Sequence, residues 1–385
     1  MPNVYASVAL RAAQQPPWTS LEELYDVCDN LRSRPPLVDS TDCHALRADL
    51  ADVAAGEAFV VQGGDCAERF ADSAAHRVEA KAAHLTSLGD RVTASTGLRT
   101  VHIGRLAGQY SKPRSSEIET VADGRRLAVY RGDAVNEPEQ TVFGRRSDPR
   151  RLLLAYDHAA TALSALRPRS TYTSHEALLL DFEEALVRPD DAYASEYASS
   201  AHLLWIGERT RQLDGAHLAF AERISNPVGV KIGPKTTPAD IATITRRLAG
   251  DHAPGRLTLI SRMGADAVAD RLPALLEAAG SYADRIVWLC DPMHGNTCLT
   301  ASGEKTRVVT EIVREVAGFF VALRAAGVRP GGLHLELTPD AVTECVDRPE
   351  DLVRTRPLPR YESACDPRLN PEQADFLLTQ ALSLL

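Results

Sequence analysis

Four polar clusters, spread over most of this 385-residue chain, each contain one side chain of a type that binds divalent metal ions. A site built from one thiolate, one imidazole and two carboxylates is unusual for a closed structural zinc site, which prefers several thiolates or imidazoles. It suits a catalytic divalent ion that keeps one coordination position open for a substrate. Each cluster follows a run of residues typical of a buried strand. The four candidate ligands are Cys66, His294, Glu336 and Asp366.

Each of these residues also has a structural interpretation when it is taken alone. Cys66 fits a buried thiol, His294 a hydrogen-bonded structural imidazole and Asp366 a turn residue. Glu336 lies within an apolar run, where an unpaired carboxylate is costly, so a metal partner accounts for it best. His334 has the same strand parity and is a candidate to face the same interior.

A second group of candidates consists of cationic residues that follow strand-like runs. The chain has a formal net charge of -9, so Arg and Lys gathered at one face predict a bound small polyanion. Arginine forks match phosphate and carboxylate groups, and lysine adds a point charge. So many cations around a metal ion predict two anionic substrates, or one with several phosphates. These cations are Arg105, Lys112, Arg114, Arg209, Arg211, Lys231 and Arg262.

Composition argues against several classes of protein. The acidic balance disfavours a nucleic-acid scaffold. The N-terminus lacks the basic and apolar regions of a signal peptide, and we expect none. No uninterrupted apolar stretch approaches the roughly 18 residues that a membrane helix needs. The seven cysteines, an odd number without regular spacing, favour a reducing cytoplasm over a disulfide framework.

The order of elements predicts an α/β fold, a parallel (β/α)8 TIM barrel. Strand-like run, polar loop and helical pattern alternate about eight times, and in such a barrel the strand C-termini converge on the face that carries the active site. An open doubly wound sheet is the second choice, but no Gly-x-Gly-x-x-Gly string opens a first helix. An eighth strand is predicted around residues 361–364, before Asp366. The other strand-like runs are residues 58–61, 100–103, 203–206, 228–232, 257–260, 286–289 and 333–337.

We divide the chain into an N-terminal helical extension, residues 1–55, and a TIM-barrel catalytic domain, residues 56–385. Residues 106–200 are predicted to form an elaborated connection between the second and third barrel strands. It contains a loop at 130–136 and helices at about 148–166 and 174–187. Further helices are predicted from Pro238 to about Gly250, and at about 266–279, 306–326 and 371–384.

Longer strings of residues resemble one protein family. Gln-Gly-Gly-Asp-Cys-Ala-Glu, Ala-Gly-Gln-Tyr-x-Lys-Pro-Arg-Ser, Gly-Glu-Arg-Thr-Arg, Cys-Asp-Pro-Met-His-Gly-Asn-Thr and Cys-Asp-Pro-Arg-Leu-Asn occur in this order. From about residue 14 to its C-terminus, the chain resembles the short form of the type II (plant-like) 3-deoxy-D-arabino-heptulosonate 7-phosphate (DAHP) synthases. The resemblance implies a TIM barrel that condenses phosphoenolpyruvate with erythrose 4-phosphate, the first step of the shikimate pathway. It also implies a divalent metal cofactor, Mn²⁺ or Co²⁺.

The same resemblance implies a role for each candidate residue. It implies metal ligation by Cys66, His294, Glu336 and Asp366. It implies phosphoenolpyruvate contacts from Arg105, Glu208, Lys231 and Arg262, and erythrose 4-phosphate contacts from Lys112, Arg114, Ser115 and Arg209. Lys305, in a Gly-x-Lys-Thr-Arg string, lines the site. Among these residues, Lys112, Glu208, Lys231 and Lys305 are the predicted catalytic ones, and either Glu208 or Glu176 handles the proton of the attacking water.

Two departures from the family pattern bear on function. The predicted connection over residues 106–200 is shorter than in the long shikimate-pathway members, where extra helices create sites for aromatic amino acids. A role in secondary metabolism is therefore expected. In addition, Ala134 occupies a position in a Tyr-Arg-Gly-Asp-x-Val-Asn string where Met is expected.

Two other functions stay open from the sequence. One is an aminoDAHP synthase, which uses an imino form of erythrose 4-phosphate and resembles this family throughout. The other is a regulatory barrel that binds a partner such as chorismate mutase without turnover, against which the intact ligand and cation sets argue. We expect a cytoplasmic homo-oligomer, a dimer, with small-molecule substrates and without nucleic-acid or membrane partners.

Overall fold

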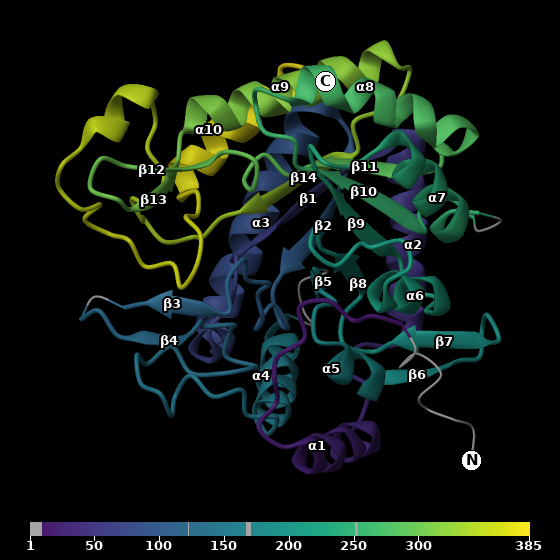
Figure 1. Cartoon of the computed structure of the whole chain (residues 1–385). Coiled ribbons are helices and arrows are strands. Elements are labelled where there is room, and N and C mark those ends of the chain that lie inside the picture. Colours follow the sequence, from purple (N-terminus) through teal and green to yellow (C-terminus); the bar gives the residue numbers. More distant parts are fainter. Residues whose placement is uncertain (1–9, 122, 167–170, 251–252) are drawn as a thin grey trace.

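Eight parallel strands close into a barrel within the part of the chain that the computed structural model describes, residues 10–121, 123–166, 171–250 and 253–385. Figure 1 shows these strands at the centre of the molecule. The predicted TIM barrel is therefore confirmed. In order around the barrel the strands are β1 (Ala58–Gly64), β2 (Arg99–Arg105), β5 (Tyr172–Glu176), β8 (Leu203–Ile206), β9 (Val228–Ile232), β10 (Leu257–Ser261), β11 (Val287–Cys290) and β14 (Gly332–Glu336), which pairs with β1.

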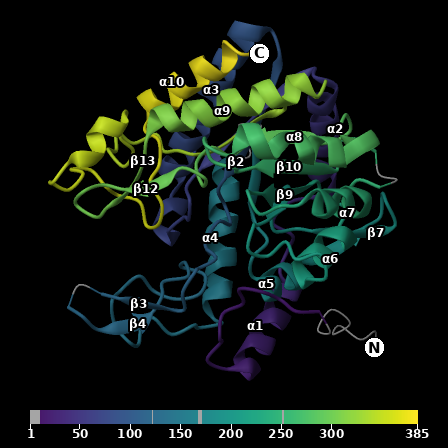
Figure 2. The ribbon, with the colours of Figure 1, turned by 45° about the horizontal axis from the view of Figure 1, so that its top comes forward.

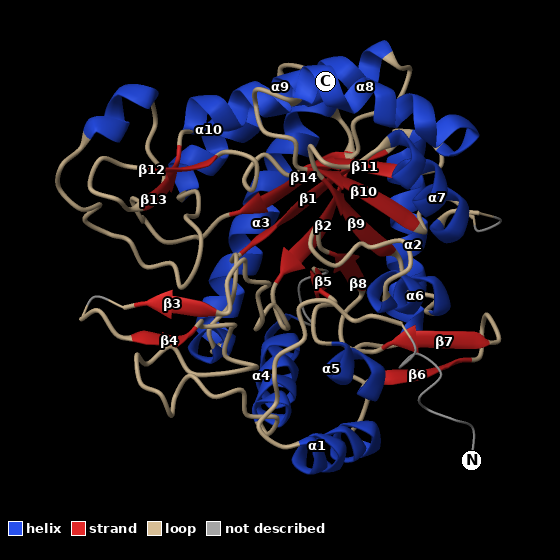
Figure 3. Ribbon diagram, in the orientation of Figure 1, coloured by secondary structure: helices blue, strands red, loops and turns tan. Residues whose placement is uncertain are grey.

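Helices surround the barrel, with one after each strand, as Figure 3 shows in blue around the red strands. The helix that opens at Thr237 carries the predicted N-terminal cap, in which Thr237 and Asp240 each accept from the other's backbone amide. The outer helices are α3 (Ala75–Thr96), α4 (Arg151–Leu166), α5 (Leu180–Ala185), α6 (Ala216–Arg223), α7 (Pro238–Leu248), α8 (Val268–Ala279), α9 (Val309–Ala325) and α10 (Pro371–Leu382).

Two helices precede the first strand, as predicted for the N-terminal extension. They are α1 (Leu21–Ser33), capped by the Ser20 hydroxyl, and α2 (Ser40–Ala55). Residues 1–9 of the predicted extension lie outside the described residues. Buried side chains of α2, including Leu46 and Leu50, pack against the inward-facing apolar residues of the barrel strands. Helix α2 therefore closes the N-terminal end of the barrel.

Alternation along the strands divides their side chains between two cores. In β1, Val60 belongs to the cluster inside the barrel, whereas Phe59 and Val61 belong to the outer cluster shared with the helices. The register pairs Gly64 with both Arg105 and Glu336. Because residues in register share a face, Arg105 and Glu336 point inward at the C-terminal end of the barrel.

The predicted strand at residues 361–364 is wrong, because the eighth barrel strand is β5. Strand β5 lies inside residues 106–200, which we predicted to be a connection, and it replaces the beginning of the helix predicted at 174–187. The strand at 203–206 is consequently the fourth barrel strand. The residues of β5 after Tyr172 are mostly polar, so they lack the apolar signature of a buried strand. These polar residues are nonetheless buried in the barrel. Their hydrogen bonds are made within the protein, as when Ser174 donates to the Gly104 carbonyl and accepts from Gln62.

Among the described residues, three two-stranded sheets extend the loops of the barrel: β3 (Ile118–Thr120) with β4 (Arg126–Ala128), β6 (Val187–Asp190) with β7 (Ser195–Ala198), and β12 (Thr297–Leu299) with β13 (Lys305–Arg307). In the turned view of Figure 2, the β3–β4 and β12–β13 hairpins project on the same side of the molecule. Within the described ranges, every helix is too short or too polar to cross a membrane.

Candidate active site

A cavity of about 420 Å³ opens at the C-terminal ends of the barrel strands. It is lined by every residue to which the family resemblance assigns a role except Glu336, which lies fully buried beneath it. Arg211, also predicted to bind an anion, does not line the cavity and instead pairs with Glu208 and Asp240. The cavity wall includes Ile118 and Glu119 of the β3–β4 hairpin. The predicted residues that line the cavity are Cys66, Arg105, Lys112, Arg114, Ser115, Glu208, Arg209, Lys231, Arg262, His294, Lys305 and Asp366.

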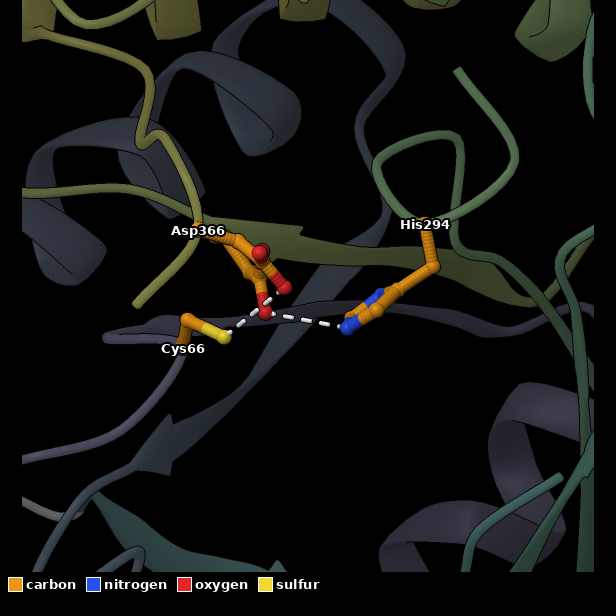
Figure 4. Close-up of side chains that lie close together, drawn as sticks. Cys66, His294 and Asp366 are labelled. Atoms are coloured by element: carbon orange, nitrogen blue, oxygen red, sulfur yellow. Dashed lines mark hydrogen bonds and ion pairs between the residues drawn. The ribbon is translucent and has the colours of Figure 1, made fainter. Parts of the chain in front are cut away.

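The four candidate metal ligands come together in this structure. One donor atom of each lies within 4.8 Å of the donors of the other three. Ligands that share one ion at bond lengths of roughly 2.0–2.3 Å lie at most about 4.6 Å apart, so the cluster fits a single divalent ion after small side-chain movements. Figure 4 shows Cys66, His294 and Asp366 pointing toward a common centre.

Three barrel strands supply these four ligands. Cys66 follows β1, His294 follows β11, and Glu336 is the last residue of β14. Asp366 lies in the long connection from β14 to α10, which is joined to the end of β14 by a bridge between Leu337 and Leu369. Asp366 therefore does not follow a strand of its own, contrary to the sequence prediction.

His294 is oriented by a neighbouring carboxylate. Its Nδ1 lies 2.8 Å from Oδ2 of Asp291, and its Nε2 lies 3.1 Å from Oε1 of Glu336. Burial alone would lower the pKa of His294, but the carboxylates of Asp291 and Glu336 raise it to about 9. Since the Asp291 contact holds a proton on Nδ1, Nε2 is the nitrogen that faces the other ligands.

Glu336 is held between cations on both of its oxygens. Oε1 accepts from Nη2 of Arg105 at 3.0 Å, and Oε2 lies 2.7 Å from Nη2 of Arg307. Burial alone would raise the pKa of Glu336, but His294, Arg307 and Arg105 hold it well below its usual range. The carboxylate is thus ionised and fixed in orientation, as a metal ligand must be.

Cys66 and Asp366 share a cationic neighbour. Nζ of Lys112 lies 2.6 Å from Sγ of Cys66 and also contacts Oδ2 of Asp366. The two ligand atoms themselves are 3.5 Å apart. Burial raises the pKa of the Cys66 thiol, and Lys112 opposes that rise. Lys112 therefore favours the thiolate, the form that binds a metal ion, but it only partly offsets the effect of burial.

A chain of neutral polar side chains supports Arg105 from inside the barrel. Because arginine only donates, His334 accepts from Arg105 through Nε2, and its Nδ1 donates to Oε1 of Gln62 at 2.8 Å. Gln62 then donates to Oγ of Ser174 at 2.9 Å. Burial, together with Lys231 and Arg105, holds the pKa of His334 well below its usual range. His334 therefore faces the interior, as its strand parity predicts.

The cations of the cavity lie at two depths. Arg105 and Lys231 are buried at the floor, where Nζ of Lys231 lies 2.8 Å from Oδ2 of Asp291. Arg209 is exposed at the rim and donates to Oγ of Ser115 at 2.9 Å. The arrangement offers one anion-binding region beside the metal cluster and a second nearer to solvent.

Comparison with known proteins assigns the chain to a family. The model of the class-II DAHP synthetase family matches residues 5–171 and 164–380. This chain belongs to that family. Its relatives include phospho-2-dehydro-3-deoxyheptonate aldolase of Streptomyces coelicolor, which is 42% identical over 95% of this chain and 93% of the relative. The protein of the same name from Mycolicibacterium smegmatis is 38% identical over 98% of this chain and 94% of its own length.

A probable phospho-2-dehydro-3-deoxyheptonate aldolase of Pseudomonas fluorescens is 44% identical over 94% of this chain and 92% of its own length. Among solved structures, phospho-2-dehydro-3-deoxyheptonate aldolase from Francisella tularensis SCHU S4 superposes with a TM-score of 0.59 and covers 93% of this chain and 95% of its own. At 15% sequence identity, that likeness supports the barrel fold alone.

Several residues of this class-II DAHP synthetase matter to the site although their roles do not follow from the sequence alone. Asp291 contacts both His294 and Lys231, and the fully buried Arg307 contacts Glu336 without lining the cavity. Both lie within strings that carry the family resemblance, but only their packing shows what they touch. Glu176, at the end of β5, lines the cavity, and its Oε1 has no hydrogen-bond partner among the described residues.

Proposed function

We propose that this class-II DAHP synthetase condenses phosphoenolpyruvate with erythrose 4-phosphate and water to give DAHP and inorganic phosphate. The observation that carries this function is the single cavity that combines a four-donor metal cluster with cations at two depths. Family membership supports the same reaction. The proposal is tested by measuring consumption of phosphoenolpyruvate and release of phosphate. Both should require erythrose 4-phosphate. An aminoDAHP synthase would need an imino form of erythrose 4-phosphate as acceptor, and a regulatory barrel would give no turnover.

The donor set fits a divalent ion that takes mixed sulfur, nitrogen and oxygen ligands. Cys66, His294, Glu336 and Asp366 would hold it, and we propose Mn²⁺ or Co²⁺. When bound, such an ion supplies Lewis acidity that polarises the aldehyde of the acceptor. The buried pairs Arg105–Glu336 and Arg307–Glu336 keep the carboxylate ligand charged and in place.

The cations are proposed to bind and orient the two substrates. Arg105, Lys231 and Arg262, with Glu208 beside them, face phosphoenolpyruvate, and Lys112, Arg114, Ser115 and Arg209 face the phosphate-bearing acceptor, with Lys305 at the edge. Held in this way, C3 of phosphoenolpyruvate forms a bond to the aldehyde carbon. Positive character develops at C2, water adds there, and phosphate leaves with cleavage of its C–O bond. Fixing two reactants in this geometry is itself a large part of the rate enhancement.

We propose that Glu176, and not Glu208, accepts the proton of the attacking water. The Glu208 carboxylate is engaged by Arg211 through both oxygens, at 3.1 and 3.2 Å. Burial raises the pKa of Glu176, and the neighbouring cations Lys231 and His294 reduce that rise without cancelling it. A carboxylate with a raised pKa is the better proton acceptor.

The proposed division of the cations predicts different kinetic defects for Arg262→Ala and Arg209→Ala. Arg262 is half-buried at the floor and donates to the His294 carbonyl at 3.1 Å, whereas Arg209 lies at the rim with Ser115. Each loss of a charge-assisted contact should cost about 1.5–3 kcal/mol, or roughly ten- to a hundredfold in kcat/KM. Steady-state kinetics should show a raised KM for phosphoenolpyruvate in Arg262→Ala and for erythrose 4-phosphate in Arg209→Ala. An equal rise of the same KM in both variants contradicts the division.

We further propose that the enzyme supplies secondary metabolism, and we predict weak or absent inhibition by phenylalanine, tyrosine and tryptophan. Feedback needs a second site whose occupancy biases two conformations. The connection from β2 to β8 already contains barrel strand β5 with α4 and α5, which leaves little chain for additional regulatory helices. Initial rates with each amino acid, singly and combined, check this expectation. Strong saturable inhibition by any of them contradicts it. A homodimer and a chorismate mutase partner stay predictions.

A further inference from the structure

We propose that the buried ion pair between Glu344 and Arg368 positions two of the metal ligands, Cys66 and Asp366, relative to each other. Neither residue of this pair lines the cavity, and neither offers a donor to the four-ligand cluster. The inference rests on the proposed metal-dependent function, and it assigns a positioning role to residues that do not touch substrate.

Glu344 shapes the loop that carries Asp366. Its carboxylate is fully buried, and its Oε1 accepts from the backbone amides of Glu362 and Ser363 at 2.9 and 2.7 Å. Its Oε2 accepts from the backbone amide of Arg368 at 2.7 Å. These three amides lie on both sides of Asp366 in the sequence. A single carboxylate therefore holds the loop on both sides of this ligand, whereas the backbone bridge to the end of β14 lies beyond it, at Leu369.

Arg368 connects that loop to the one that carries Cys66. Its guanidinium donates to both oxygens of Glu344, at 2.8 and 3.1 Å. Its third nitrogen, Nη1, donates to Oδ1 of Asp65 at 2.6 Å. Asp65 directly precedes Cys66, is 2% exposed, and has its other oxygen paired with Lys81. The guanidinium group of Arg368 thus links two loops whose metal ligands are three hundred residues apart in the chain.

This network of buried charges is expected to add little to the free energy of folding. Buried ion pairs commonly contribute little net free energy, because removing the charges from water offsets their attraction. Their geometric demands, however, fix the partners in one arrangement. Glu336 obtains that fixed position from the register of β14, whereas Cys66 and Asp366 lie on loops and need another constraint. Side chains that orient metal ligands from outside typically contribute ten- to a hundredfold to metal affinity.

The decisive variant is Glu344→Gln, which preserves shape but replaces one acceptor oxygen with an amide that cannot accept. Metal-stripped protein is titrated with Co²⁺, and binding is read from the thiolate-to-Co²⁺ charge-transfer absorption that reports Cys66 as a ligand. We expect roughly ten- to a hundredfold weaker Co²⁺ binding and a weaker charge-transfer band at saturation. Asp190→Asn is the matched control, because Asp190 is 1% exposed, is paired with His44 and Ser225, and lies away from the cavity. It should lower the melting temperature without changing Co²⁺ affinity.

Arg368→Lys keeps the proposal testable if Glu344→Gln does not fold. A lysine retains the charge but cannot contact Glu344 and Asp65 through three nitrogens at once, so Co²⁺ binding should weaken similarly. A folded Glu344→Gln or Arg368→Lys protein that binds Co²⁺ as tightly as the parent, with the same absorption band, overturns the positioning role. Failure of the parent protein itself to bind Co²⁺ would instead contradict the proposed metal-dependent function.

Discussion

Chelation of the divalent ion is expected to abolish turnover, and Mn²⁺ or Co²⁺ is expected to restore it. The physical reason is the donor cluster at the floor of the cavity, where four ligand atoms lie within 4.8 Å of one another. Without a Lewis acid at that point, the aldehyde carbonyl has only hydrogen-bond donors to stabilise the developing alkoxide. The measurement is the rate of phosphoenolpyruvate consumption by chelated enzyme, before and after addition of each metal, with the metal content determined by elemental analysis. Full activity in a metal-free preparation contradicts the expectation.

Cys66→Ser provides the matching variant for this experiment. A hydroxyl is a much weaker ligand than a thiolate, so this variant should need a higher concentration of Mn²⁺ or Co²⁺ to reach half of its maximal rate. Cys43→Ser is the control, because Cys43 is also fully buried but lies in α2 at the opposite end of the barrel. An unchanged metal titration in Cys66→Ser would remove this residue from the site.

The barrel itself was largely predictable because most of its strands are continuous apolar runs. Strand β9, for example, is buried at every position and sits between two other parallel strands. Strand β5 escaped prediction because its polar residues are satisfied by tertiary partners that lie far away in the sequence, such as Gln62 for Ser174. The helix and strand patterns of local sequence carry no information about such partners.

The types of the site residues were predictable, whereas their mutual support was not. Cys66, His294 and Glu336 stand out as metal-binding residue types after or within an apolar run, whereas Asp366 does not follow one. The contacts that orient them join positions far apart, as when Arg368 meets Asp65 or Arg307 meets Glu336. Only the folded barrel brings these pairs together. The same reasoning explains why Asp366 was wrongly placed after its own strand. Its loop is held by distant contacts, among them the buried carboxylate of Glu344 and the bridge from Leu337 to Leu369, which local periodicity does not record.

Glu176→Gln is expected to lower kcat by roughly 10²–10⁴-fold, the usual effect of losing a general base. The carboxylate lines the cavity, and its Oε1 lies against Gly207, where an added Cβ would approach it to 2.0 Å. Glycine at this position therefore leaves space for the Glu176 carboxylate at the cavity wall. Burial raises the pKa of Glu176, so glutamine, which is neutral and nearly isosteric, should be tolerated without loss of thermal stability.

The pH dependence distinguishes a general base from a residue that only packs. A base must be ionised, so kcat/KM should fall as the pH drops through the pKa of Glu176, at a higher pH than for an ordinary glutamate. This fall is the acidic limb of the pH profile. In Glu176→Gln the acidic limb should disappear, and the residual rate should vary little over the same pH range. Glu208→Gln is the matched control, because Arg211 already engages the Glu208 carboxylate, and it should retain the limb with a smaller loss of kcat. If Glu208→Gln instead loses the limb and costs more in kcat, then Glu208 takes the proton and the assignment to Glu176 is wrong.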